Sequence, residues 1–115
     1  MKVTILTPYV STNKLYTTSR TTGRRILTKK ARVHKEAIAW EAKAQVGAQK
    51  PMKGELQVEV HWFMPDKRRR DLDNIKMVLD SLTSVCWEDD SDIWVLRIFK
   101  YIDKEKPRFE ITICK

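Results

Sequence analysis

The sequence predicts a small α+β domain in which two helices alternate with the strands of a mixed sheet, in the order β-α-β-α-β-β. Two observations carry this prediction. Apolar and polar residues alternate from Glu55 to Met64 and again near the C-terminus, which is typical of half-buried strands. Two other segments repeat their apolar residues every three or four positions, which is typical of amphipathic helices.

Length and composition point to one domain, residues 1–115. The chain is 42% apolar and 33% charged, which suits a single modest core. No apolar run reaches the roughly 18 residues of a membrane-spanning helix, and the N-terminus is too weakly apolar for a signal peptide. We therefore expect a cytoplasmic protein with no membrane partner. Cys86 and Cys114 lack metal-ligand spacing, so we expect two buried thiols and no disulfide.

The first half of the chain predicts a strand, a loop and a helix. Residues 2–6 form the short strand. Residues 8–27 are polar and basic without periodicity, and we expect a mobile basic loop there. Thr28 can cap a helix that runs to about Val46, and Gly47 can end it. The expected apolar face of this helix consists of Val33, Ala37, Trp40 and Ala44.

The second half predicts three further strands and a second helix. The strand at 55–64 has a buried face, and the helix that follows it, with Asp73 or Asn74 as its cap, runs to about Leu82. Residues 93–102 are apolar on both sides, so we expect a strand covered on both faces, followed by a closing strand to Cys114. We expect three tryptophans in the core: Trp40, Trp62 and Trp94. The fourth, Trp87, is expected at the wall of a site.

The charge distribution indicates a polyanionic partner. The net charge is +8 and the pI is about 9.7, which favours nucleic acid or another anionic surface. Residues 1–54 contain 12 Lys or Arg and only 2 acidic residues, whereas residues 55–115 contain 11 basic and 13 acidic residues. The first half of the chain is therefore suited to holding the anion, and the second half contains the acids.

A run of four cations leads directly into a pair of carboxylates. Asp71 and Asp73 are two positions apart, so in an extended chain both point to one side, where they could share a hard cation such as Mg²⁺. The alternative is that Asp73 caps the helix and Asp71 pairs with a neighbouring arginine. Spacing alone leaves both open. The four cations are Lys67, Arg68, Arg69 and Arg70.

A second acidic group lies just before the strand at 93–102. If the intervening helix brings it near Asp71, several like charges converge, which is costly unless a cation lies among them. Metal-assisted phosphodiester hydrolysis requires carboxylates that hold a metal ion and nearby cationic side chains that bind the phosphate backbone of the nucleic acid. The alternative is a solvated acidic turn. The group consists of Glu88, Asp89, Asp90 and Asp92.

Lys76 and Asp80 lie one helical turn apart. One interpretation is an exposed ion pair that stabilises the helix by a few tenths of a kcal/mol. The other is a site in which Lys76 binds a phosphate group. His34 and His61 have no second ligand at metal spacing and are assigned structural roles.

These residues resemble the RusA-type Holliday junction resolvases. The resemblance rests on "RRRDLDN", a short amphipathic helix and "VCWEDDSDI", and it spans roughly residues 55–113. The segments "PYVSTNKLY" and "GRRILTKKA" match the N-terminal half of the family more loosely. The resemblance implies a RusA-like fold and a homodimeric endonuclease of DNA recombination and repair, which cuts four-way junctions symmetrically with Mg²⁺ or Mn²⁺.

The resemblance also implies roles for individual residues. Asp71, Asp73 and Asp90 would be the catalytic metal ligands, and Lys76 the catalytic lysine. Only Ile75 separates Asn74 from Lys76, where the family has two residues; the spacing of four from Lys76 to Asp80 is kept, which suggests a one-residue deletion at the start of the helix. DNA contacts would come from Lys67, Arg68, Arg69, Arg70, Asn74, Asn13, Lys14, Arg24 and Arg25.

Two other functions stay open at this point. A non-catalytic nucleic-acid-binding module would use the acids only as caps and ion-pair partners. A metal nuclease of other specificity would cut flaps, forks or RNA.

Overall fold

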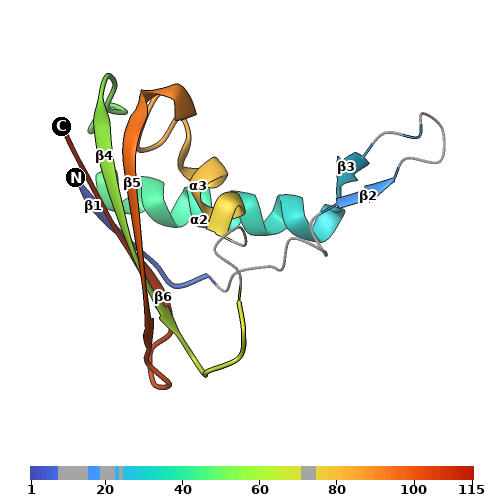
Figure 1. Ribbon diagram of the computed structural model, residues 1–115. Coiled ribbons are helices and arrows are strands. Elements are labelled where there is room, and N and C mark those ends of the chain that lie inside the picture. The colour runs from blue at the N-terminus through green and yellow to red at the C-terminus, as the bar shows by residue number, and fades with distance from the viewer. Residues whose placement is uncertain (8–15, 19–22, 24, 71–74) are drawn as a thin grey trace.

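The computed structural model describes residues 1–7, 16–18, 23, 25–70 and 75–115 (Figure 1). The expected order of elements is confirmed, with two short additional strands. The elements are β1 (Lys2–Ile5), β2 (Tyr16–Thr18), β3 (Arg25–Leu27), α2 (Lys29–Val46), β4 (Leu56–Met64), α3 (Lys76–Leu82), the 3₁₀ helix η2 (Asp90–Asp92), β5 (Ile93–Ile102) and β6 (Arg108–Cys114).

The main sheet is mixed, as predicted, with the strand order β1-β6-β4-β5. Strands β4 and β5 are parallel, and β6 is antiparallel to both β4 and β1. In the parallel pair Leu56 lies beside Ile93, and Met64 lies beside Ile102. The carboxyl end of β4 and the amino end of β5 therefore lie at opposite ends of the sheet, and α3 lies in the connection between them (Figure 1).

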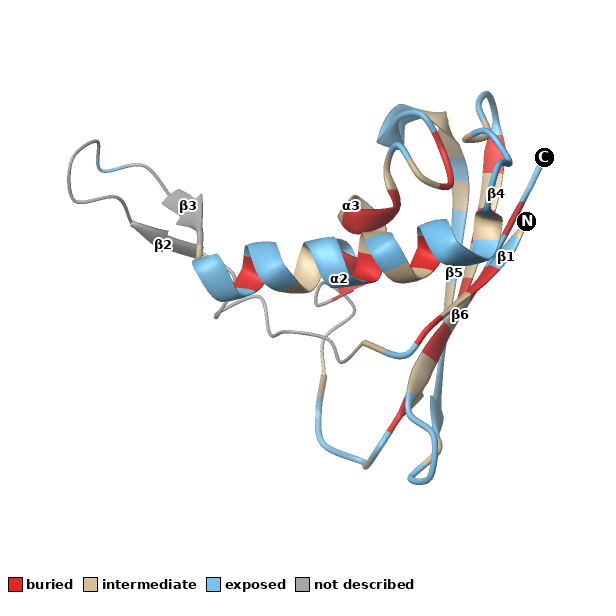
Figure 2. Cartoon of the chain, turned by 180° about the vertical axis from the view of Figure 1, so that it is seen from behind, coloured by how far each residue is buried: buried red, intermediate tan, exposed pale blue. Residues whose placement is uncertain are grey.

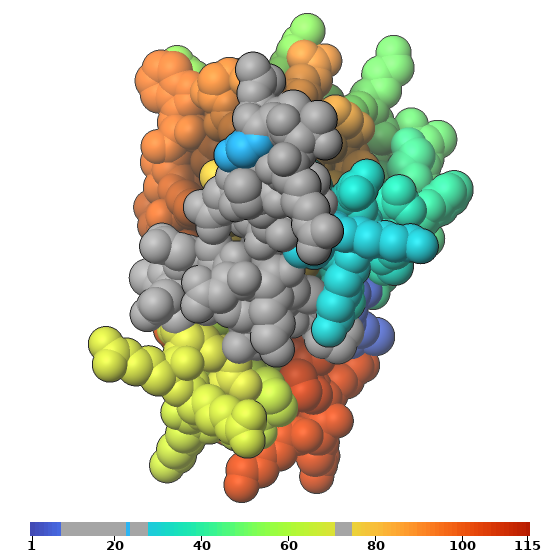
Figure 3. All heavy atoms as spheres, turned by 90° about the vertical axis from the view of Figure 1, so that its right-hand side faces the viewer, coloured from blue at the N-terminus to red at the C-terminus, as the bar shows by residue number. Residues whose placement is uncertain are grey.

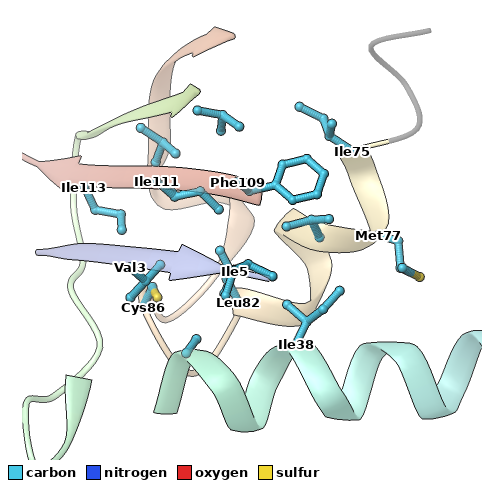
Figure 4. Packing of buried hydrophobic residues seen from close by; sticks show 14 of the residues in the cluster. Val3, Ile5, Ile38, Ile75, Met77, Leu82, Cys86, Phe109, Ile111 and Ile113 are labelled. Atoms are coloured by element: carbon cyan, nitrogen blue, oxygen red, sulfur yellow. The ribbon is translucent and has the colours of Figure 1, made fainter. Parts of the chain in front are cut away.

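Both helices pack against one face of the main sheet, and the core lies between the helices and the sheet (Figures 1 and 4). On β4 the inward residues are all buried and alternate with partly exposed ones, as the sequence predicted. In Figure 4, Ile38 of α2 and Leu82 of α3 lie beside Ile5 of β1. Burying one such side chain stabilises the fold by about 1.5–3 kcal/mol.

Helix α2 has the predicted ends but a different buried face. The Thr28 hydroxyl accepts a 3.1 Å hydrogen bond from the Ala31 amide, and Gly47, with φ 59°, ends the helix. The buried residues are Ala31, Ile38 and Ala42. The predicted face of Val33, Ala37, Trp40 and Ala44 is wrong: Trp40 is 75% exposed. Two of the three buried residues are alanines, which give only a weak apolar signal.

The N-terminal loop and the second helix differ from expectation at their ends. Part of the predicted loop 8–27 forms an antiparallel hairpin, in which Tyr16 pairs with Leu27. Helix α3 begins at Lys76, and Ile75 precedes it without a side-chain cap bond. The expected caps, Asp73 and Asn74, lie outside the described residues.

Strand β5 contradicts the prediction of a strand covered on both faces. It is an edge strand with no buried residue, and Trp94 is 68% exposed rather than in the core. Trp87, expected at the wall of a site, is fully buried. Both cysteines are free as expected, but only Cys86 is buried and Cys114 is exposed. None of the described helices is long and apolar enough to cross a membrane.

Candidate active site

Asp90 is held against the C-terminal end of α3 by two hydrogen-bond donors. The Thr83 hydroxyl donates a 2.8 Å bond to Asp90 Oδ1, and the Trp87 indole N–H donates to the same oxygen at 3.3 Å. The indole N–H also lies 3.2 Å from the Thr83 hydroxyl. Because Trp87 is fully buried and Asp90 is exposed, the protein interior fixes the orientation of a carboxylate that faces solvent.

The neighbouring acids of the turn are engaged locally. Asp89 accepts bonds from the hydroxyl and the amide of Ser91, and these bonds hold the pKa of Asp89 below its usual value. Asp92 accepts a 3.1 Å bond from the Gly54 amide. The turn is therefore an organised structure, in which Asp90 is the residue bonded to α3.

A second carboxylate, that of Asp80, lies near Asp90, and two ammonium groups lie near Asp80. Burial raises the pKa of Asp80, and the negative charge of Asp90 raises it further. Lys76 on α3 and Lys35 on α2 act in the opposite direction. Asp80 therefore interacts with charged groups of α2, α3 and the acidic turn; its side chain is half-buried, whereas Lys76 is exposed.

Several predicted site residues lie outside the described part of the chain: Asp71, Asp73, Asn74, Asn13, Lys14 and Arg24. Arg25 lies in β3, and its side chain is also not described. Among the described residues, no group of three or more His, Cys, Asp or Glu side chains is placed to hold a metal ion. The described part of the candidate site thus consists of Asp90, Asp80 and Lys76.

The basic run divides into three exposed cations and one that is almost buried. Lys67, Arg68 and Arg69 are exposed. The Arg70 side chain is only 7% exposed and donates a 2.9 Å bond to Asp66 Oδ1, which lowers the pKa of Asp66. Arg70 also donates to the Arg68 carbonyl, so it fixes the path of the run. Figure 3 shows the end of this run (yellow-green) and the start of α2 (cyan) on one face of the molecule.

An apolar pocket of about 370 Å³ lies elsewhere, at the carboxyl end of β4. Its lining includes Trp62, Phe63, Pro107 and Phe109. Asp90 precedes β5, whose start lies beside Leu56 at the opposite end of β4. The pocket is therefore separate from Asp90.

Comparison of the sequence with known proteins identifies the family of this chain. A family model for Endodeoxyribonuclease RusA matches residues 6–114. The chain belongs to the RusA family. It is 33% identical over 110 residues to the crossover junction endodeoxyribonuclease RusA of Escherichia coli (strain K12), covering 91% of this chain and 87% of that protein. The same identity and coverage hold for the proteins of that name from Enterobacteria phage 82 and Shigella sonnei (strain Ss046).

The RusA match confirms the family and the endonuclease class that the sequence predicted. It leaves the individual residue assignments as predictions. The sequence placed Trp87 at the wall of the site but did not predict its bond to Asp90, and it missed the other donor, Thr83. Neither residue type signals such a role by its spacing, because the contact depends on how the chain folds back after α3.

Proposed function

We propose that this RusA-family chain is a metal-dependent endonuclease that resolves four-way DNA junctions in recombination and repair. The observation that carries the proposal is the exposed carboxylate of Asp90, which Thr83 and buried Trp87 hold in place near a second carboxylate, Asp80. A fixed carboxylate near an acid that is itself coupled to a lysine, Lys76, is suited to phosphodiester chemistry. The relatives named as crossover junction endodeoxyribonucleases support the choice of substrate.

The donor set fits a hard divalent cation. Asp71, Asp73 and Asp90 are the proposed ligands of Mg²⁺ or Mn²⁺, which prefer carboxylate oxygens. Of these, Asp90 is described, is exposed, and lies close enough to a second carboxylate, Asp80, to affect its pKa. When bound, the metal would activate water and offset negative charge on the phosphate.

The protein's own groups have separate tasks in the proposed reaction. Thr83 and Trp87 fix the direction of the Asp90 carboxylate. Lys76, exposed on the first turn of α3, would stabilise charge on the phosphate or the leaving oxygen. Lys67, Arg68 and Arg69 would bind the DNA backbone, which makes binding strongly salt-dependent.

Two further features belong to the proposal. A four-way junction has approximate two-fold symmetry, and two symmetric nicks require two active sites, so we propose a homodimer. Because the relatives come from bacteria and a phage, we also propose that the protein acts on DNA in the bacterial cytoplasm.

The test is a nicking assay on labelled four-way junction, flap, duplex and single strand, with Mg²⁺, Mn²⁺ or EDTA. We expect paired nicks in the junction that depend on the metal. Asp90→Asn should lower nicking by roughly 100-fold or more while junction binding is retained, because a charged catalytic group is lost but the cationic surface is not. Glu88→Gln, two residues away and exposed, is the matched control.

Each other outcome excludes part of the proposal. Cutting of duplex or RNA alone would exclude a junction resolvase. Binding without cutting in either metal would favour a nucleic-acid-binding module. Full activity in Asp90→Asn would remove Asp90 from the catalytic site while leaving the family assignment intact.

A further inference from the structure

Lys100 places a charge in an otherwise apolar row of β5. Residues on paired strands that lie side by side point to the same face of a sheet. The partners of this row on β4 are all buried, so the row points to the side of the sheet that the helices cover. The row consists of Leu96, Ile98, Lys100 and Ile102, which lie beside Val58, Val60, Trp62 and Met64. A lysine at this position requires a reason.

The ammonium group of Lys100 makes two contacts on that side. It donates a hydrogen bond to the carbonyl oxygen of Arg70, and it lies 5.5 Å from the centre of the Trp62 ring. An aromatic ring attracts a cation at this distance, so Trp62 helps to fix the direction of the long side chain. Arg70 lies thirty positions earlier in the chain. The bond from Lys100 therefore connects β5 to the segment that follows β4.

This segment, residues 65–70, is also folded on itself. The Arg68 amide donates a 2.9 Å bond to Asp66 Oδ1, and the Arg70 guanidinium donates to the same oxygen and to the Arg68 carbonyl. Figure 2 shows the segment mostly in pale blue, with tan where it meets the grey residues. The bonds among Asp66, Arg68 and Arg70 give the segment its shape, whereas the bond from Lys100 attaches it to the sheet.

The attached carbonyl directly precedes a proposed metal ligand. The Arg70 carbonyl belongs to the peptide bond that leads to Asp71. Because a peptide group is planar, a hydrogen bond that fixes its carbonyl also fixes the direction in which the chain enters the next residue. Small displacements of reacting groups lower catalytic rates strongly. An attachment at this point is therefore suited to placing the carboxylate of Asp71.

A charge on an edge strand can have a simpler purpose. Inward-pointing charged residues on edge strands prevent pairing with other chains. That purpose needs only a hydrated charge at the edge. The ammonium group of Lys100 instead donates to a backbone carbonyl and lies beside an aromatic ring. These contacts favour an attachment over a guard of the edge.

We propose that Lys100 is a positioning residue of the active site, whose ammonium group holds the Arg70 carbonyl and so fixes the start of the segment that contains Asp71. The catalytic part of this inference rests on the proposed function, because it takes Asp71 as a metal ligand. The attachment of residues 65–70 to β5 does not rest on it, and it is measured separately.

The first experiment is limited trypsin digestion of the full chain without added metal. Lys100→Met keeps the length of the side chain and removes the donor. Cleavage after residues 67–70 should become at least about tenfold faster, because it follows the fraction of molecules in which the segment is released, and a bond from a charged donor is lost. Cleavage within α2 should not change, which separates local release from global unfolding. Mass spectrometry identifies the cleavage positions.

Arg97→Met is the matched control for this digestion. It removes the other cation of β5, which lies beside partly exposed Glu59 rather than beside a buried residue of β4. Arg97 donates to Gln57, on the neighbouring strand, and not to the segment after β4. Cleavage after residues 67–70 should therefore be as slow in Arg97→Met as in the wild type.

The second experiment measures nicking of four-way junctions at saturating Mg²⁺. Lys100→Met should lower kcat at least about tenfold and leave KM within about twofold, because the reacting groups are displaced while the exposed cations that bind DNA remain. Lys100→Arg keeps a charged donor and should recover most of the rate. Arg97→Met should nick at the rate of the wild type.

The two experiments separate the attachment from the catalytic role. Unchanged trypsin cleavage in Lys100→Met would overturn the attachment. Faster cleavage with an unchanged kcat would overturn the positioning role. A raised KM with an unchanged kcat would assign Lys100 to the DNA backbone instead. A wild type that cuts no DNA would overturn the proposed function, and with it the catalytic role of Lys100, while an attachment shown by trypsin would stand.

Discussion

Thr83 Oγ1 donates a 2.8 Å hydrogen bond to Asp90 Oδ1, and this bond connects the end of α3 to the acidic turn before β5. The two lie seven positions apart along the chain. The same oxygen accepts a bond from the indole of fully buried Trp87. The direction of this exposed carboxylate is therefore set by the core, and it can be tested by changing the donors while Asp90 is left in place.

Thr83→Val removes one donor at nearly constant side-chain volume. A hydrogen bond to a charged group contributes about 1.5–3 kcal/mol, so we expect nicking of four-way junctions to fall at least about tenfold. Junction affinity should not change, because the cationic surface is untouched. Single-turnover nicking and a gel-shift titration measure the two effects. Thr83→Ser keeps the hydroxyl and should retain activity; equal loss in both variants would argue against orientation of Asp90.

The exposed and buried tryptophans should respond differently to substitution. Trp87→Phe loses a buried N–H donor and some core volume, and we expect it to lower the free energy of unfolding by about 1–3 kcal/mol. Trp40→Phe, on the exposed side of α2, should stay within about 0.5 kcal/mol of the wild type. Urea unfolding measures both. A large loss for Trp40→Phe would mean that another chain covers this side of α2.

The two thiols should differ in reactivity. Burial raises the pKa of the Cys86 thiol to about 11, and its side chain is inaccessible, whereas Cys114 is exposed. At pH 8 we expect a chromogenic disulfide reagent to label one thiol per native chain, and the second only in denaturant, because the thiolate is the reactive form. Native Cys114→Ser should not react. Rapid labelling of that variant would show that the site of Cys86 opens readily.

Asp103 should account for part of the loss of fold stability at acidic pH. The Lys106 amide and the Arg108 guanidinium hold the pKa of Asp103 below its usual 3.8. A carboxylate with a lowered folded-state pKa stabilises the fold above pH 3.8, and this contribution is lost as the pH falls through the folded-state pKa. Asp103→Asn should therefore lower the melting temperature at pH 7, and the difference from wild type should shrink below pH 3.8. A difference that is constant with pH would contradict this linkage.

The sequence by itself determined the elements and the family. Strict alternation along β4 predicted its buried face, because a strand presents every second residue to the core. Thr28 and Gly47 predicted both ends of α2, because an N-cap hydroxyl and a residue with positive φ satisfy local backbone requirements. The spacing of "RRRDLDN" and "VCWEDDSDI" predicted the RusA family, which the comparison confirmed.

Only the tertiary structure decided which apolar residues are covered and how Asp90 is held. Trp40 and Trp94 looked like core residues, but coverage depends on where the helices cross the sheet, and they leave both residues exposed. Ala31 and Ala42 are buried instead, since small residues allow α2 a close approach that no local pattern specifies. The bonds from Thr83 and Trp87 to Asp90 join residues seven and three positions apart, and they form because the chain folds back after α3, where burial of Trp87 fixes the turn.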